Sequence, residues 1–572
     1  MLKQILPLTL ILFFGFTPHT SRSVSDGPQA PTHSSDGPVP ATIGFFMDNW
    51  RPKTFIAPPS ISRPATTTPA PATATLTIDA DSVLTRILPS EFGHNAVTWM
   101  GAVTNQPTVV TNLTNLHPNI IRWPAGSGSD GYFWNCAPGH LTRDVPVFLI
   151  DENGKKKFAQ YFYGRSADPR VASLDDYYDM LKKTGNQGLI TVNYGYARYG
   201  RSENPVATAA HLAADWVRYD HGRTKYWEIG NENYGTWELG FRIDTAVNKD
   251  GQPEFLSGEL YGRHFMIFAD SMRKAAAETG AVIYIGAVTH EAAPMPWDGP
   301  CTRNWNAGVM KAAHDHPDFY VVHNYFTPYN MNSNATDILH TAVATPEKMI
   351  GYIRQCLQES GAALKPVVMD EWNMFAVGSH QQVSNISGLF AVIVLGETIR
   401  SKYGLACRWD LFNGWAGGND HGLFSAGDEP GVQRWSPRPS FYYLYYLQRC
   451  LGDRLVDTRI TGDTSIRAYA STFSSGELGA ALVNTSATAT AVKLDLKHFV
   501  PGRRYYWYTL QGGDDNGEFS AKVTVNGEGP TGSAGGPDNY AAIKANAAAA
   551  TNHIGVTVPA HGAVFLVIDS RR

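Results

Sequence analysis

Short apolar runs separated by helix-like segments dominate the middle of the chain. After Thr75, runs of five or six mostly apolar residues recur, each bounded by Gly, Pro or polar residues, as strands are. Apolar residues at helical spacing fill several of the intervals, namely 174–184, 207–219 and 260–279. The eight apolar runs are 92–97, 119–123, 189–194, 226–230, 282–286, 319–323, 366–370 and 405–410.

The order of these elements predicts the fold class. Strands that are apolar on both sides are typical of parallel sheets covered by helices. Eight successive strand-and-helix units are typical of a closed barrel rather than an open sheet. The sequence therefore predicts an α/β fold, a (β/α)8 TIM barrel, over residues 83–450.

A different pattern begins after Leu451. In segments such as 465–470 and 479–484, apolar and polar residues alternate, which is typical of antiparallel strands with one buried face. We therefore expect residues 451–572 to form a C-terminal antiparallel β-sandwich domain. The strand-like residues 75–82 have no helix of their own, so we expect that strand to join the sandwich.

The first 74 residues contain two kinds of segment. A short basic start precedes the apolar run 5–16, which is too short to span a bilayer and predicts a signal peptide over residues 1–23. Residues 24–74 are rich in Pro, Ser and Thr and predict a linker. We expect a secreted or periplasmic protein without stable membrane insertion, and an uncleaved anchor is the alternative, since residues 17–24 show no obvious cleavage site.

The composition excludes one class of partner. The net charge is −4 and no basic stripe is present, so we expect no nucleic-acid binding. Aromatic residues make up 12% of the chain. Such rings suit a carbohydrate partner, because a Trp or Tyr face covers the apolar face of a sugar.

Two strand ends carry a glutamate. The run 226–230 is followed by Asn231 and Glu232, and the run 366–370 is followed by Glu371. Catalytic groups of a parallel barrel come from the carboxyl ends of its strands. We therefore expect both glutamates at the mouth of the barrel.

Glu228 and Asp370 compete for the same roles. A single glutamate is usually a solvated surface charge, but a charge at the end of a barrel strand is costly unless it has a partner or a function. Strand alternation and the position before Trp372 favour Glu371 over Asp370, and we prefer Glu232 over Glu228.

A pair of carboxyl groups facing each other across a pocket matches the needs of one reaction. Cleavage of a glycosidic bond with retention requires one protonated carboxyl that releases the leaving oxygen, and one carboxylate that attacks the anomeric carbon. We assign Glu232 as the acid/base and Glu371 as the nucleophile.

Two motifs resemble those of a known enzyme group. Residues 227–232 resemble the Gly-Asn-Glu acid/base signature of the retaining glycoside hydrolases of clan A, which are built on (β/α)8 barrels. Residues 369–373 resemble the Asp-Glu-Trp-Asn nucleophile signature of the α-L-arabinofuranosidase family 51. The resemblance extends to the neighbouring families 39 and 79 and covers residues 76–569.

The resemblance implies roles for further residues. His323 and Tyr325 match a His-x-Tyr element in which the tyrosine hydroxyl bonds to the nucleophile and the histidine helps to set protonation. Arg122 matches an arginine that helps to keep the nucleophile ionised. Asn231 matches the residue that bonds the sugar 2-hydroxyl. By position alone, Trp372 and Asn193 are candidate substrate contacts.

The sequence also departs from family 51 at the first strand. Members carry a substrate-binding glutamate there, whereas the run 92–97 has none, and Glu91 precedes the matching position. This departure weakens the case for arabinofuranose in particular and leaves the chemistry unaffected.

The sequence thus predicts a retaining glycoside hydrolase that cleaves plant-type polysaccharides or oligosaccharides by double displacement. α-L-Arabinofuranosidase is the first expected specificity, and a β-xylosidase, a β-glucuronidase or an endo-glycanase are the alternatives. A non-catalytic carbohydrate-binding protein is the alternative from another class. We expect no cofactor and no metal, since the segment 314–316 offers His and Asp donors without a third ligand nearby.

Overall fold

The structure is a computed structural model that describes residues 43–63, 72–116, 120–296, 298–550 and 554–571. The predicted signal peptide, and the part of the predicted linker before residue 43, lie outside the described residues. No helix among the described residues is both long enough and apolar enough to cross a membrane.

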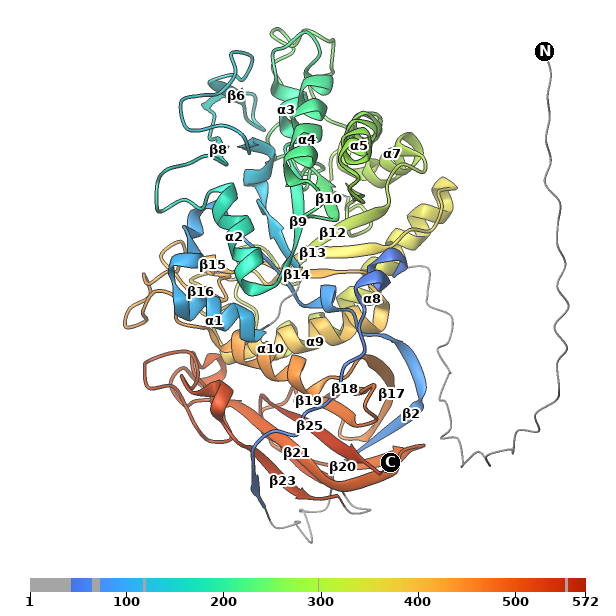
Figure 1. The fold of residues 1–572 in the computed structure, drawn as a ribbon, viewed down its shortest axis with the longest axis vertical. Helices are drawn as coiled ribbons and strands as arrows, with labels where there is room; N and C mark the ends of the chain where they lie inside the picture. The colour runs from blue at the N-terminus through green and yellow to red at the C-terminus, as the bar shows by residue number, and fades with distance from the viewer. Residues whose placement is uncertain (1–42, 64–71, 117–119, 297, 551–553, 572) are drawn as a thin grey trace, which may run out of the picture. The chain divides into compact units, whose positions relative to one another are not determined.

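Eight parallel strands close into a barrel in the order β10-β11-β12-β13-β14-β3-β4-β9 (Figure 1). Each predicted apolar run overlaps one of these strands, so the predicted barrel is confirmed. The strands are β3 (Gly93–Asn95), β4 (Ile120–Trp123), β9 (Gln187–Val192), β10 (Tyr226–Ile229), β11 (Tyr284–Val288), β12 (Phe319–Tyr325), β13 (Val367–Asn373) and β14 (Ala406–Arg408).

Helices follow the strands and cover the outside of the barrel. The predicted helix at 174–184 has the same bounds in the structure, because Ser173 and Asp176 form a capping box at its start and Gly185 adopts the left-handed conformation at its end. The helices are α1 (Pro107–Leu116), α2 (Leu174–Thr184), α3 (Gly195–Tyr199), α4 (Pro205–Asp220), α5 (Gly258–Thr279), α6 (Pro300–Arg303), α7 (Trp305–Ala313), α8 (Ala335–Ser360), α9 (Asn385–Ser401) and α10 (Pro439–Cys450).

The C-terminal residues form an 11-stranded sheet together with two strands that precede the barrel. Most neighbours are antiparallel, as predicted, but β1 with β23 and β2 with β20 are parallel pairs. The strands are β1 (Ser60–Ser62), β2 (Ala74–Arg86), β17 (Arg454–Gly462), β18 (Ile466–Thr472), β19 (Leu478–Asn484), β20 (Thr490–Lys497), β21 (Pro501–Gly512), β22 (Val523–Val525), β23 (Ala545–Ala549), β24 (Gly555–Val558) and β25 (Gly562–Ser570).

The sheet folds over an apolar core of its own. β24, at one end of the strand order, contacts β19 and β25, and residues such as Leu76, Leu482 and Leu566 are buried between the layers. β2 lies between β17 and β20, so the early strand expected to join this domain does so. The barrel with a C-terminal β-domain is therefore confirmed.

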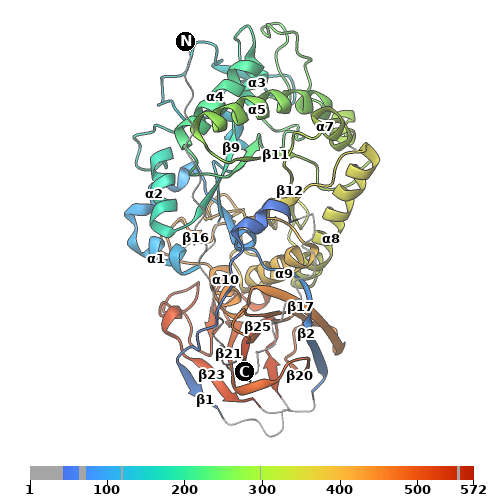
Figure 2. The same ribbon diagram turned by 45° about the vertical axis from the view of Figure 1, so that its right-hand side comes forward.

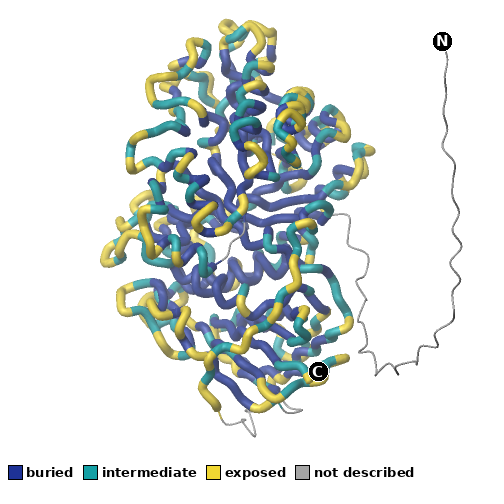
Figure 3. Tube along the Cα trace, viewed as in Figure 1, coloured by how far each residue is buried: buried dark blue, intermediate teal, exposed yellow. Residues whose placement is uncertain are grey.

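Helices α9 and α10 lie between the barrel and the sheet (Figure 1). Residues 385–399 of α9 are all buried, and Figure 3 shows this helix and the barrel strands as the most enclosed parts of the fold. A helix that is covered on every side is apolar all round and lacks the polar stripe of a surface helix.

Residues 43–63 pack against both parts of the fold. The helical turn η1 (Gly44–Asn49), blue in Figure 2, places Phe46 against Tyr226 and Phe319 at the amino ends of the barrel strands. Further on, β1 pairs with β23 of the sheet. Composition alone placed these residues in the linker 24–74, and the domain limits stay a prediction.

The loops at the carboxyl ends of the barrel strands contain short helical turns and small two-stranded sheets. After β4 come η5 (Ser127–Gly131) and two small sheets, β5 (Tyr132–Phe133) with β8 (Phe162–Tyr163) and β6 (Phe148–Ile150) with β7 (Lys156–Phe158). After β14, β15 (Phe412–Asn413) pairs with β16 (Phe424–Ser425). The remaining short helical turns are η2 (Pro89–Phe92), η3 (Thr98–Met100), η4 (Val103–Asn105), η6 (Gly517–Phe519) and η7 (Tyr540–Ala542).

Candidate active site

A fully buried arginine at the carboxyl end of β4 organises the mouth of the barrel. The Nε atom of Arg122 lies 2.9 Å from Glu228, its Nη1 lies 2.9 Å from Glu371, and its Nη2 donates to Asn231 at 2.8 Å. The Nε atom is also 3.6 Å from Asp370. One guanidinium therefore links β4, β10 and β13, which the rigid, planar fork of arginine suits well.

Glu371, on β13, accepts hydrogen bonds on both carboxylate oxygens. The Tyr325 hydroxyl donates to Oε1 at 2.7 Å and Arg122 donates to Oε2. The pairing of β12 with β13 shifts register here, so that one extra residue of β13 falls between the Val321 and His323 positions. Such a bulge interrupts strand alternation, and both Asp370 and Glu371 contact groups inside the barrel.

Glu232 lies on the turn after β10, where its φ of 42° is unusual for a residue with a side chain. Its Oε1 is 2.9 Å from Nδ1 of His323, whose Nε2 is 3.1 Å from Asp370. One carboxylate oxygen of Glu232 and one of Glu371 lie within 4.8 Å of each other. This separation matches the roughly 5–5.5 Å between the carboxyl groups of retaining glycosidases.

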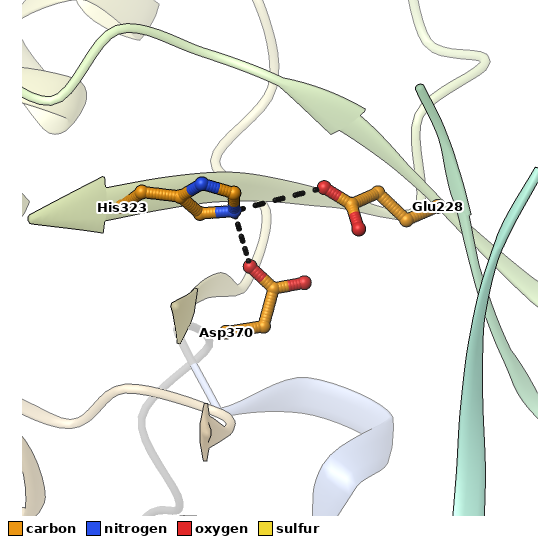
Figure 4. Close-up of side chains that lie close together, drawn as sticks. All are labelled: Glu228, His323 and Asp370. Carbon is orange, nitrogen blue, oxygen red and sulfur yellow. Dashed lines mark hydrogen bonds and ion pairs between the residues drawn. The ribbon is translucent and has the colours of Figure 1, made fainter. Parts of the chain in front are cut away.

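These side chains form one charged group, which we call the mouth cluster. It contains more carboxylates than cations, so its members shift one another's pKa values. Figure 4 shows how His323, Glu228 and Asp370 converge within it. The mouth cluster consists of Glu228, Glu232, Asp370, Glu371, Arg122 and His323.

The pKa shifts within the mouth cluster follow from burial and charge. Burial raises the pKa of Glu228 to about 7, against the opposing charge of Arg122. Burial alone would lower the pKa of His323, but the charge of Glu371 and the bonds to Asp370 and Glu232 raise it well above its usual value. Burial alone would raise the pKa of Glu232, but the bond and charge of His323 lower it.

The mouth cluster contains two sets of potential metal donors. The donor atoms of Glu228, His323 and Asp370 lie within 4.8 Å of one another, as do those of Glu232, His323 and Glu371. Arg122 already contacts a carboxylate of each set, and its fixed positive charge would repel a cation there. The residues therefore do not favour a metal.

Comparison with known proteins places this geometry in context. No protein-family model matches the chain. A curated protein of Acetivibrio thermocellus, named intracellular exo-alpha-(1->5)-L-arabinofuranosidase, is 22% identical over 279 residues, which are 47% of this chain and 48% of the relative. A Streptomyces lividans protein of the same name is 24% identical over 282 residues, 47% of this chain and 37% of the relative. The chain spans about half the length of the curated relatives it matches, or less.

Solved structures resemble the chain over most of its length. The α-L-arabinofuranosidase of Thermotoga maritima superimposes with a TM-score of 0.60 at 16% identity and covers 86% of this chain and 99% of that one. The bifunctional glucanase-xylanase CelM2, from a metagenome library, reaches 0.56 at 12% identity, covering 87% and 99%. The chain resembles clan A, close to family 51. At this identity the structures show the shared fold, and the predicted resemblance is confirmed.

The structure brings most of the predicted site residues together. Arg122, Asn231 and the His323–Tyr325 element of the family 51 resemblance all contact a glutamate of the pair or each other. Whether Glu232 and Glu371 react as assigned stays a prediction.

Two predicted substrate contacts have protein partners in the structure. Asn193 is buried under the loop after β9, where it bonds to the backbone of Tyr132 and Tyr196. Trp372 is 1% exposed and packs against Phe390 of α9, on the outside of the barrel. Position after a strand suggested both, but the amide of Asn193 bonds to its own loop and to the loop after β4, and the bulge in β13 turns Trp372 outward.

Sequence reasoning missed the supporting roles of two carboxyl residues. It considered Glu228 and Asp370 only as rival catalytic groups, whereas both are fully buried behind the glutamate pair and contact Arg122. It also missed Glu238, which bonds to Asn231 from the same turn. Their place just inside or after a barrel strand was the available signal.

The departure at the first strand is visible in the structure. Glu91 is buried and bonds to Thr398 of α9, away from the mouth cluster. At the carboxyl end of β3, Asn95 bonds to Arg122 instead. Among the described residues, β3 therefore supplies no glutamate to the site.

The expected location of the protein was wrong. We predicted a secreted or periplasmic protein from residues 1–23, which lie outside the described residues. The curated relatives from Acetivibrio thermocellus, Halalkalibacterium halodurans, Streptomyces lividans and Bacillus subtilis are named as intracellular enzymes, which contradicts that prediction.

Proposed function

We propose that the protein is a retaining glycoside hydrolase that acts by double displacement, with Glu232 as acid/base and Glu371 as nucleophile. The observation that carries this proposal is the pair of carboxylates within 4.8 Å of each other at the ends of β10 and β13. That spacing supports direct attack by Glu371, because the carboxyl groups of an inverting enzyme stand about 6.5–9.5 Å apart to hold a water.

In the first step, Glu371 attacks the anomeric carbon and forms a glycosyl ester, while Glu232 gives its proton to the leaving oxygen as the glycosidic bond breaks. Arg122 and Tyr325 stabilise the attacking carboxylate, since each donates to one of its oxygens. Asn231 lies on the same side of the site, held by Arg122, and would bond a sugar hydroxyl.

His323 supplies the proton that Glu232 needs. Its Nε2 faces Asp370 and its Nδ1 faces Glu232, so a proton can move from Nδ1 to Glu232 and leave a neutral imidazole. The transfer also neutralises His323, whose charge lowers the pKa of Glu371, while it removes the charge of Glu232, which raises that pKa. The attacking carboxylate is then kept ionised by Arg122 and by the bond from Tyr325.

In the second step, Glu232 takes a proton from water, and the resulting hydroxide attacks the anomeric carbon. The ester bond to Glu371 breaks, the sugar leaves with its original configuration, and Glu232 is again protonated. The neutral His323 imidazole can accept that proton, which returns the mouth cluster to its starting state.

For the substrate, we propose an α-L-arabinofuranoside as the first candidate, which the names of the curated relatives and of several similar structures support. The absence of a glutamate from β3 argues for testing other sugars. The similar structures also include a glucanase-xylanase and a Paenibacillus polymyxa xyloglucanase, so a longer glycan chain is the second candidate. Trp237, 60% exposed beside Glu232, offers a ring for such a chain.

The test is hydrolysis of a panel of aryl glycosides by the wild type and by Glu371→Ala. The panel holds the α-L-arabinofuranoside, β-xyloside, β-glucuronide, β-glucoside and β-galactoside. Glu359→Ala, which removes an exposed glutamate of α8, is the matched control. Release from one glycoside that is lost only in Glu371→Ala supports the proposal and names the sugar.

Other outcomes are equally informative. Activity on a polysaccharide alone would identify an endo-acting enzyme. Binding of glycans without any hydrolysis would mean a carbohydrate-binding protein and would overturn the proposal. A product with inverted configuration in a magnetic resonance assay would overturn the double displacement.

A further inference from the structure

The turn that carries Glu232 has an unusual backbone. Gly230 and Glu232 both have positive φ values, of 77° and 42°, and only the first is a glycine. A side chain in the left-handed region is held there by its surroundings, because the isolated backbone disfavours it. Something must therefore hold Glu232 in place.

The turn is bonded to a buried aspartate from another loop. Asp130 lies on η5 after β4 and is 0% exposed. Its Oδ2 accepts from the backbone N–H of Asn231 at 3.3 Å and from Nδ2 of Asn233 at 2.7 Å. These are the two residues on either side of Glu232, so one carboxylate oxygen spans the strained position.

The other oxygen of Asp130 anchors the carboxylate. Oδ1 accepts from the backbone N–H of Gly195, at the start of α3, at 3.0 Å. Within the described part of the chain, no Lys, Arg or His nitrogen lies within 4.0 Å of this carboxylate. These three hydrogen-bond partners of the Asp130 carboxylate are N–H groups. The carboxylate is therefore held by directional hydrogen bonds and not by an ion pair.

We propose that Asp130 is a positioning residue that holds Glu232 in its left-handed conformation and so aims its carboxyl group at the leaving oxygen. The proposal rests on the proposed function, in which Glu232 is the acid/base. Asp130 does not touch the reacting atoms. It acts through the backbone of Asn231 and the side chain of Asn233.

A second buried carboxyl beside the turn provides a matched control. Glu238 uses only Oε1, which accepts from Ser127 Oγ at 2.6 Å and from Asn231 Nδ2 at 3.1 Å. Its Oε2 has no partner among the described residues. An amide can replace this group, since its oxygen accepts both bonds and its nitrogen takes the unused position.

Asp130 cannot be replaced in this way. Both of its oxygens accept hydrogen bonds, and an amide would turn an N–H group toward one set of donors. Asp130→Asn should therefore release the turn, whereas Glu238→Gln should preserve it. The two substitutions are the same chemical change at two buried sites near Asn231.

The experiment compares leaving groups. If Glu232 is misplaced, substrates with a poor leaving group lose rate because they need its proton, while a dinitrophenyl glycoside leaves with little help. At pH 8, above the pKa of about 7 to which burial raises the Asp130 carboxyl, we expect Asp130→Asn to lower kcat/KM about 100-fold for an alkyl glycoside and less than about 5-fold for the dinitrophenyl glycoside. Glu238→Gln should change kcat/KM by the same factor on both substrates, because it leaves the bonds of Asp130 to the turn in place.

Asn233→Ala guards against a folding artefact, because it removes the shorter bond to the turn and leaves Asp130 in place. It should show the same dependence on the leaving group, with a thermal midpoint near that of the wild type. An equal loss on both substrates in Asp130→Asn and Asn233→Ala, or no loss in either, would overturn the proposal. A wild type inactive on both substrates would overturn the proposed function, and this inference with it.

Discussion

The two ends of the barrel interior are built from the same strands but from opposite kinds of side chain. At the amino ends the inward residues are apolar, and two positions further along β4, β10, β12 and β13 they are ionisable. In β4 the pair is Ile120 and Arg122, and in β10 it is Tyr226 and Glu228. Residues that precede β3 complete the apolar cluster at this end, which consists of Ile43, Phe46, Leu88, Ile120, Leu189, Tyr226, Phe319, Val321, Val368, Leu405 and Cys407.

The two ends of the barrel interior make different contributions, one to the stability of the fold and the other to the chemistry of the site. Each large side chain buried at the apolar end contributes about 1.5–3 kcal/mol of burial free energy. Each ion at the charged end carries a desolvation penalty of several kcal/mol, which its partners only partly offset. The apolar end thus supports the fold, while the charged end keeps reactive groups close together at a cost.

The sharpest test of this comparison is Glu371→Gln. Removing the nucleophile should lower kcat by about 10^4-fold or more, measured on the glycoside that the wild type cleaves. Stability should not fall, because the change removes one of the excess carboxylates and keeps the volume. A drop of the thermal midpoint together with activity would contradict the division between the two ends.

Arg122→Met tests how the charged end is held together. It leaves Glu228, Asp370 and Glu371 without their shared cation, so the free energy of unfolding should fall by about 3–5 kcal/mol. Denaturant titration at pH 7 measures the effect. An unchanged midpoint would show that protonation of the carboxyl groups already removes enough negative charge for the site to be stable without the arginine.

Phe46→Ala tests the apolar end. Phe46 is 0% exposed and packs on Tyr226 and Phe319, so its loss should lower the free energy of unfolding by about 3 kcal/mol. The value of kcat at 25 °C should stay within twofold of wild type. Ile56→Ala, on the same segment but at an 85% exposed position, should leave both unchanged. A large fall in kcat would show that the two ends are coupled.

The pKa values of the buried histidines differ with their surroundings. His323 is held charged by carboxylates, whereas burial lowers the pKa of His94, His264 and His421 to about 3. These three stay neutral in the fold but take up protons near pH 6.5 when unfolded, so stability present above pH 6.5 is lost as the pH falls. The loss should reach about 1.4 kcal/mol per pH unit for each histidine.

Thermal midpoints between pH 8 and 5 measure this effect. His421→Gln should reduce the slope by about a third, since an amide can keep the bond from the ring nitrogen to the Met374 carbonyl. A slope unchanged in this variant would mean that other groups dominate the acid response.

Much of the fold followed from local pattern. The eight apolar runs predicted the eight strands because a strand buried on both faces is apolar whatever its neighbours are. Helix α2 was predicted to the residue from its apolar spacing, and the capping residues beside it in the chain set the same bounds in the structure. Helix α9 was not predicted, because a helix that is buried on all sides lacks the alternation of apolar and polar faces from which a surface helix is recognised.

Only part of the site was predicted from the sequence. Glu232 and Glu371 were found because each follows a strand end, a property that can be read from the chain. The inward turn of Asp370, the outward turn of Trp372 and the use of Asn193 by its own loop depend on a bulge and on loop contacts. Nothing adjacent in sequence encodes these.

The sequence by itself determined which residues form strands, which chemistry the strand ends offer and which family they resemble, because these depend on residue type and short spacing. Only the tertiary structure decided that Arg122 joins three strands, that Asp130 holds the turn of Glu232, and that residues 43–63 pack against the barrel and the sheet. Those contacts join residues up to several hundred positions apart. Their geometry is set by register and packing, which no local segment contains.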